Sequence, residues 1–255
     1  MEKKAILVVS FGTAYPETRA RTIDAIEADL ASAFPDRRLS RAWTSGFIRR
    51  KLKAAGTAID SVAEVMERMA NDGIEDVLIQ PTHMLAGEEF DKLCSELAEW
   101  KASFASVSVG APLLAEKSDV ETLARLLPAV GPVLAENEMM IWMGHGSPHM
   151  ELPVYSILNE LAPPGHCVGA MEGVPDFDSV LSHVRACRPA KVYLAPLMVV
   201  AGSHAVHDMA GASPDSWESR LQREGLAVEC IFKGMGEYEA VRAIYTAHAR
   251  CAKPI

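Results

Sequence analysis

The sequence predicts an α/β protein of two similar domains, each with a parallel four-stranded sheet flanked by helices. Three observations favour this fold. Strand-like apolar runs alternate with helical patterns along the 255 residues, the first strand (AILVVS) lacks polar alternation, and the whole pattern starts again halfway. Such alternation is typical of parallel sheets with right-handed crossovers, whose strands are buried on both faces.

The first half of the chain is expected to hold four strands and four helices. Pro16 introduces the first helix, over residues 17–34. The segment PAVGP at 128–132 has two prolines and a glycine, so we place the domain boundary there, giving domains 1–128 and 129–255. The expected strands are Ala5–Ser10, Leu39–Thr44, Asp76–Gln80 and Val107–Val109, and the other helices are Ile59–Ala70, Phe90–Phe104 and Asp119–Leu127.

The second half repeats this arrangement, and its last helix is free to pack on either domain. Its strands are expected at Met139–Met143, Cys167–Met171, Val192–Ala195 and Ala227–Phe232, and its helices at Leu152–Leu161, Phe177–Cys187, Ser216–Glu224 and Glu237–Arg250.

The two halves also share local motifs. SFGTAYP (10–16) and GHGSPHM (144–150) follow their first strands, whereas PTHMLAGEEFD (81–91) and PLMVVAGSHAVHD (196–208) follow their third. Aligning these motifs puts Phe11 opposite His145 and Glu89 opposite His204. We interpret this as a duplication in which the second half carries the imidazoles; the alternative is that any two α/β halves resemble each other at strand ends.

Composition excludes several classes of function. The net charge of −9 disfavours nucleic-acid binding, which needs a basic face. The five cysteines form no CxxC pair, which is typical of reduced thiols. AILVVSFG after Lys3-Lys4 is read as a strand because it is short and lacks a cleavage site. No apolar run reaches the length of a membrane span, so we expect a cytoplasmic protein that does not bind membranes.

Polar side chains follow three neighbouring strands of the second half. His145 follows the first, Glu172 the second, and His204 and His207 the third. Ligands bind outside the carboxyl ends of strands in open parallel sheets, so these side chains are expected at one edge. Two imidazoles and a carboxylate suit a divalent metal with open positions. The alternative for each histidine is a plain loop residue, and His149 and His207 are either supporting partners or surface residues.

Other chemistries fit less well. The chain has no GxxxxGK[ST] loop, so no nucleotide is expected, and HExxH is absent. The segment GMGEYE (234–239) lacks the third glycine of a dinucleotide loop. A Ser10–His145 pair lacks a nucleophile elbow.

The first half is predicted to attract an anionic, flat ligand. The run FIRRKLK (47–53) is cationic in an acidic chain, although it is also typical of a solvated helix face. Nearby hydroxyl groups and backbone amides would bind carboxylates, and apolar residues near the mouth between the halves would form walls, unless they belong to the core. The candidate substrate-binding residues are Ser10, Thr13, Thr44, Ser45, Arg49, Arg50, Lys51, Met84, Leu85, Glu89, Met198, Val199 and Val200, with Arg19 as a further cation.

Several motifs together resemble a known family. LVVSFGT, TSGFIRRKL, MGHG, GAMEG and PLMVVAGSHAVHDMA with a nearby DSW occur in the order found in class II chelatases, the group of ferrochelatase and the anaerobic cobaltochelatases. The resemblance implies a two-domain fold with a tetrapyrrole in the cleft between the domains, and insertion of Co²⁺ into sirohydrochlorin on the oxygen-independent route to cobalamin. It implies that His145 and His204 are catalytic and that Glu172 is the acidic metal ligand, and it leaves His207 outside this set.

Some alternatives stay open at this point. The ligand types do not distinguish Co²⁺ from Fe²⁺ or Ni²⁺, so a sirohydrochlorin ferrochelatase or a nickel chelatase would carry the same residues. A non-catalytic metal or haem carrier is a more distant alternative. Precorrin-2 is a second possible substrate, and family members associate, which makes a homo-oligomer possible.

Overall fold

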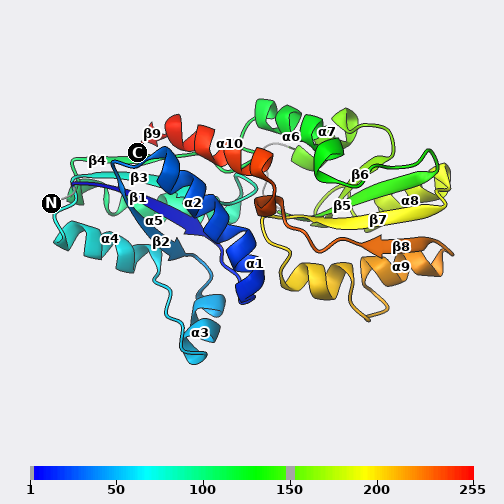
Figure 1. Cartoon of the computed structure of the whole chain (residues 1–255), viewed down its shortest axis with the longest axis horizontal. Helices are drawn as coiled ribbons and strands as arrows, with labels where there is room; N and C mark the ends of the chain where they lie inside the picture. Colours follow the sequence, from blue (N-terminus) through cyan, green and yellow to red (C-terminus); the bar gives the residue numbers. More distant parts are fainter. Residues whose placement is uncertain (1–2, 148–152) are drawn as a thin grey trace. The chain divides into compact units, whose positions relative to one another are not determined.

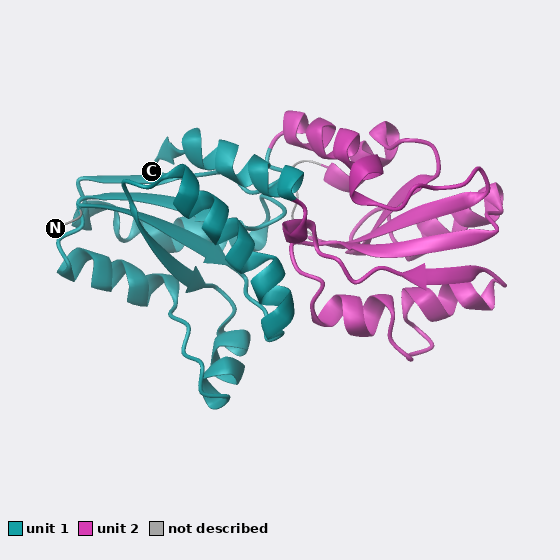
Figure 2. Cartoon of the chain, in the orientation of Figure 1, with its two compact units in different colours: residues 1–115, 239–255 teal, residues 116–238 magenta. Residues whose placement is uncertain are grey.

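The computed structural model describes residues 3–147 and 153–255, which form two compact α/β units (Figure 2). Unit 1 comprises Met1–Ala115 with Glu239–Ile255, and unit 2 comprises Glu116–Tyr238. Parallel strands flanked by helices build both units, which confirms the predicted fold class. The units divide at 115/116 and 238/239, whereas the sequence led us to expect one boundary at 128/129.

Unit 1 is built on a sheet of strand order β2-β1-β3-β4-β9 (Figure 1). The first four strands are parallel, as predicted, whereas β9 adds two residues antiparallel to β4. Two residues have no periodicity, so the sequence did not predict β9. The strands are β1 (Lys4–Ser10), β2 (Arg38–Trp43), β3 (Asp76–Pro81), β4 (Ser106–Val109) and β9 (Lys253–Pro254).

The helices of unit 1 include one from the far end of the chain. In α10, the Arg242 guanidinium donates to Asp29 of α2 at 2.6 Å, and the buried Tyr245 hydroxyl donates to the Thr82 carbonyl at 2.9 Å. These bonds join the C-terminal helix to the first half of the chain. The helices are α1 (Pro16–Arg21), α2 (Ile23–Ala33), α3 (Gly46–Ala54), α4 (Val62–Asn71), α5 (Glu88–Ala98), η1 (Lys101–Ser103) and α10 (Glu239–Arg250).

Two local features of unit 1 differ from the sequence-based expectation. The helix expected over 17–34 is broken at Thr22, whose hydroxyl donates to the Thr18 carbonyl. Helix α3 was not among the expected helices. It buries only Leu52, so it lacks the apolar stripe that reveals a helix in a sequence. Ser45 is its N-cap residue, and the Ser45 side chain accepts a hydrogen bond from the Ile48 amide.

Unit 2 has a parallel sheet of order β6-β5-β7-β8, the order of the four parallel strands of unit 1. The equal order supports an internal duplication. Its strands are β5 (Glu138–Gly146), β6 (His166–Glu172), β7 (Lys191–Leu197) and β8 (Ala227–Cys230), and its helices are α6 (Lys117–Val130), α7 (Val154–Leu161), α8 (Phe177–Cys187), η2 (Ala205–Met209), α9 (Trp217–Arg223) and η3 (Met235–Glu237).

Two boundaries in unit 2 correct the prediction. The expected joint at 128–132 is wrong at its start, because α6 continues through Pro128 and buries Leu127 and Val130. Strand β5 runs to Gly146, beyond the expected end at Met143, and therefore contains His145. Among the described residues, no helix is long and apolar enough to cross a membrane.

Candidate functional site

His145 is held at the carboxyl end of a central strand. Strand β5 lies between β6 and β7, and its last residue, Gly146, is paired with Glu172 at the end of β6. His145 is exposed, whereas its neighbours Gly144 and Gly146 are buried. The imidazole therefore projects from a rigid, hydrogen-bonded strand rather than from the loop that the glycines suggested.

The two glycines that flank His145 allow the end of β5 to pack closely against Tyr155 and Glu172. A Cβ on Gly144 would lie 2.5 Å from the Tyr155 ring, and a Cβ on Gly146 would lie 1.8 Å from the Glu172 carbonyl oxygen. Gly146 also has φ = +86°, a left-handed conformation that disfavours side chains. Both positions thus require glycine. At Gly144 a side chain would clash with Tyr155, and at Gly146 it would clash with the Glu172 carbonyl and also strain the backbone.

Tyr155 of α7 supports the same strand end. It is buried, and its hydroxyl oxygen accepts from the Gly146 amide at 3.3 Å. Burial raises the pKa of Tyr155 to about 12, so the phenol stays protonated at neutral pH. This role of Tyr155 was not predicted, since a tyrosine within a helical pattern is indistinguishable from an ordinary core residue.

His204 reaches the same region from the segment after β7, just before η2. Its Nδ1 lies 2.7 Å from Oδ2 of Asp208, one helical turn further on. Asp208 was also missed, although the spacing of four residues in HAVHD is a signal for such a pair. The carboxylate fixes the orientation of the ring, as carboxylates do for metal-binding histidines.

The two imidazoles lie together, as predicted from the shared edge. The ring centroids of His145 and His204 are 5.0 Å apart, with an interplanar angle of 77°. His145 Nδ1 lies 3.1 Å from the Gly146 carbonyl oxygen. Because carbonyl and carboxylate oxygens only accept, both Nδ1 atoms carry a proton, so a metal ion would bind through the two Nε2 atoms. Two imidazole rings that can serve as metal ligands are therefore available side by side.

The other residues considered for the metal site make no described contact with the two imidazoles. Glu172 is exposed at the adjacent strand end, opposite Gly146. Among residues 3–147 and 153–255, no group of three His, Cys, Asp or Glu side chains is arranged to hold a metal ion. His207 is exposed in η2, and His149 lies outside the described residues. The arrangement thus brings two imidazoles together, with Glu172 at the end of the neighbouring strand.

Three of the four predicted hydroxyl groups are used within unit 1. Ser10 is buried and accepts from the Thr82 hydroxyl at 2.8 Å, and Thr13 accepts from the Tyr15 amide at 3.3 Å. Ser45 caps α3. These contacts assign the three groups a role in local structure, whereas the buried Thr44 hydroxyl has no partner in the described chain.

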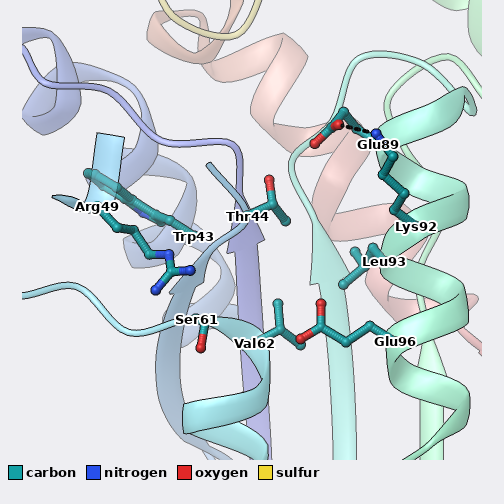
Figure 3. A pocket seen from close by; sticks show the side chains of 9 residues that line it. All are labelled: Trp43, Thr44, Arg49, Ser61, Val62, Glu89, Lys92, Leu93 and Glu96. Carbon is teal, nitrogen blue, oxygen red and sulfur yellow. Dashed lines mark hydrogen bonds and ion pairs between the residues drawn. The ribbon is translucent and has the colours of Figure 1, made fainter. Parts of the chain in front are cut away.

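The cationic run divides into one inward and two outward side chains. Arg49 lines a cavity together with Thr44 and Glu89, as Figure 3 shows. Arg50 and Lys51 are exposed on α3. Only Arg49 of the three therefore has the surroundings of a binding residue, and Arg19 pairs with Asp24.

The predicted apolar walls are partly buried in their own units. Leu85 forms a bridge with Leu114, and Met198 packs against the core of unit 2. Next to Met84 in the chain, both ring nitrogens of His83 are buried without a partner in the described chain, and burial lowers the pKa of His83 to about 4. His83 is therefore neutral at neutral pH. The partly exposed wall residues are Met84, Leu85, Met198, Val199 and Val200.

Comparison with known proteins finds cobalt chelatases over nearly the whole chain. A family model described as cobalt chelatase (CbiK) matches residues 4–253. The chain is 38% identical to the sirohydrochlorin cobaltochelatase of Salmonella typhimurium, over 96% of this chain and 95% of that protein. It is 33% identical to sirohydrochlorin cobaltochelatase CbiKC of Nitratidesulfovibrio vulgaris, over 99% and 91% of the two chains.

Solved structures support the fold. SirB from Bacillus subtilis, determined with Fe³⁺, matches with a TM-score of 0.61 and 14% identity over 97% of this chain and 94% of that chain. CbiX, described as the terminal enzyme of sirohaem biosynthesis in denitrifying bacteria, matches with a TM-score of 0.57 and 17% identity over 98% and 100% of the chains.

Replacing Gly146 tests the packing that presents His145. Gly146→Ala should lower the free energy of unfolding by more than about 3 kcal/mol, since overpacking adds to the cost of a left-handed alanine. Gly225→Ala is the matched control, because Gly225 has φ = +82° with no atom within 4 Å of an added Cβ. Urea unfolding monitored by circular dichroism measures both variants. Equal destabilisation would show that the contact with Glu172 is unimportant.

Proposed function

This chain belongs to the cobalt chelatase (CbiK) family, and we propose that it inserts Co²⁺ into sirohydrochlorin on the anaerobic route to cobalamin, without ATP. The match to the family and to two sirohydrochlorin cobaltochelatases supports the reaction. The paired imidazoles of His145 and His204 carry the proposed mechanism, because they provide two nitrogen ligands next to each other at the carboxyl end of one sheet.

The reaction exchanges one metal ion for two protons. Co²⁺ loses its bound water, two pyrrole N–H bonds break, and four cobalt–nitrogen bonds form as two protons leave. These new bonds provide the driving force, so no external source of energy is needed. Histidine suits both the binding of the metal and the removal of protons, since its unperturbed pKa lies near neutrality.

The separation of the rings suits a shared metal ion. A metal–imidazole bond of about 2 Å places each ring centroid about 3 Å from the metal, so two rings at a tetrahedral angle have centroids about 5 Å apart. The centroids of His145 and His204 are 5.0 Å apart. Glu172 supplies a third ligand in this proposal, because it ends the strand next to His145 and its carboxylate offsets part of the charge of Co²⁺.

The two histidines have different partners, which suggests different roles. His204 donates its Nδ1 proton to the Asp208 carboxylate, the arrangement that holds a metal ligand firmly. His145 donates to a backbone carbonyl. We therefore assign His204 as the lasting metal ligand and His145 as the group that accepts a pyrrole proton while the metal moves to the macrocycle.

Alanine substitutions test these assignments. His145→Ala and His204→Ala should each lower cobalt insertion at least about 100-fold, because each removes a ligand or a proton acceptor. His183→Ala, an exposed position on α8, is the control and should retain full activity. The absorption change of sirohydrochlorin with Co²⁺ measures turnover, and circular dichroism checks the fold.

The same assay separates the alternatives. Parallel reactions with Fe²⁺ and Ni²⁺ would reveal a chelatase with another preferred metal. Binding of sirohydrochlorin and Co²⁺ without turnover would identify a carrier and contradict the proposal. Wild-type turnover in both alanine variants would instead exclude His145 and His204 as the catalytic groups.

Asp208 is a positioning residue in this mechanism. Asp208→Asn should lower kcat/KM for Co²⁺ about 10- to 100-fold, the usual effect of losing the partner of a metal-binding histidine. Asp215→Asn, in the same unit, is the control. A steady-state titration of Co²⁺ at saturating sirohydrochlorin gives both values. If KM and kcat for Co²⁺ stay at the wild-type level, the bond to His204 has no part in metal handling.

A further inference from the structure

A cavity of about 280 Å³ lies within unit 1, beyond the end of strand β2 (Figure 3). It is bordered by the last residues of β2, by α3, by the start of α4 and by one face of α5. A water molecule takes about 30 Å³ of liquid, so this space holds several waters or the side arm of a larger molecule. The lining residues are Trp43, Thr44, Arg49, Ser61, Val62, Glu89, Lys92, Leu93 and Glu96.

Three polar atoms of this lining are buried without a hydrogen-bond partner in the described chain. They are Trp43 Nε1, Thr44 Oγ1 and Arg49 Nε. A buried donor without a partner costs about 1–3 kcal/mol, so three such atoms among the lining residues of one cavity are expensive in a protein without ligand. Two of them only donate and the threonine hydroxyl can donate, so they call for a ligand with acceptor oxygens.

Among the charged residues that line the cavity, Arg49 has a weak ion pair. Its ion pair with Glu64 is long, at 3.4 Å. Glu64 is 60% exposed, and it already accepts from the Ser61 amide at 2.6 Å and the Ser61 hydroxyl at 2.7 Å, which lowers its pKa. An exposed, shared ion pair of this kind contributes little, so Arg49 can turn from Glu64 to a ligand carboxylate at a small cost.

The acidic lining residues are held by other groups. Lys92 pairs with Glu89 at 3.2 Å and with Glu88 at 2.8 Å. Glu96 accepts from the amide of Ala63 at 3.1 Å, in the first turn of the ten-residue helix α4. Lys92 is thus shared by two glutamates, Glu96 is held by a backbone amide, and the positive end of α4 borders the cavity beside Arg49.

We propose that this cavity binds one carboxylate arm of the tetrapyrrole substrate. This inference rests on the proposed function, since sirohydrochlorin carries eight carboxylates. The two oxygens of the arm accept from Arg49, from the indole N–H of Trp43 and from the Thr44 hydroxyl, and the methylene groups of the arm contact Val62 and Leu93. The three donor atoms are buried by protein atoms when no ligand is bound. In this proposal the Arg49 side chain therefore moves when the carboxylate arm enters.

The site therefore selects for a substrate with carboxylate arms and takes no part in bond formation. Sequence reasoning placed Thr44 and Arg49 among the substrate-binding residues but missed Trp43, which resembles a core residue because it is fully buried. Its effect belongs to substrate affinity, in contrast to that of the imidazole pair.

Equilibrium binding of metal-free sirohydrochlorin to the full chain tests the site without chelation. Arg49→Gln should raise Kd about 10- to 100-fold, the effect of losing a charge-assisted hydrogen bond, and Thr44→Val should raise it about 5-fold. Lys53→Gln, an exposed cation on the same helix, is the matched control and should leave Kd unchanged. In cobalt insertion, the Arg49 and Thr44 variants should change KM much more than kcat.

Tryptophan emission gives an independent measure. Sirohydrochlorin should change the emission of the wild type more than that of Trp43→Phe; should this variant not fold, the Arg49 and Thr44 variants still decide. Acetate and succinate, tested alone, report on free carboxylates as an alternative source of the ligand. Their binding together with a sirohydrochlorin Kd independent of Arg49 would overturn the proposal.

The failures of the two proposals are distinguishable. If the wild type inserts cobalt while Arg49→Gln and Thr44→Val bind sirohydrochlorin as tightly as the wild type, the carboxylate site is wrong and the chelatase function stands. If the wild type binds sirohydrochlorin in an Arg49-dependent manner but never inserts metal, the carboxylate site stands and the chelatase function is wrong.

Discussion

The close approach of the end of β5 to its neighbours is the constraint on which the site depends. Gly144 packs on the Tyr155 ring, and Gly146 lies against the Glu172 carbonyl in a left-handed conformation. Any side chain at these two positions would push the strand end away from β6 or α7. With both glycines, the strand stays in register to its last residue, and His145 alone projects. A rigid strand therefore sets the position of an exposed imidazole, which favours a fixed ligand geometry.

The second imidazole is positioned in a different way, and this contrast is the basis of the proposed division of roles. His204 lies outside the sheet and depends on the Asp208 carboxylate for its orientation. Because each Nδ1 is used in a hydrogen bond, both Nε2 atoms are left for a metal. The position aligned with His145 in the sequence of unit 1 is Phe11, which is half-exposed. In the proposed mechanism, the metal ligands all come from unit 2, while unit 1 offers the polar cavity.

Much of this arrangement was predictable because parallel sheets give strong signals. The buried strands are continuous apolar runs, and their carboxyl ends share an edge, so the meeting of His145 and His204 followed from the sequence. Other features have no such signal. Tyr155 and Trp43 look like core residues, α3 has a single buried side chain, and the buried Ser10 hydroxyl reveals its bond to Thr82 only in three dimensions. A proline such as Pro128 usually ends a helix, but α6 contains it in its last turn.

The central claim is that His145 and His204 bind the same cobalt ion. X-ray absorption at the cobalt edge, on Co²⁺ bound to the protein without tetrapyrrole, measures this directly. We expect the scattering of two imidazole rings at about 2 Å, falling to one ring in either single alanine variant. A spectrum with only oxygen ligands, or one that does not change when either histidine is removed, would contradict the account.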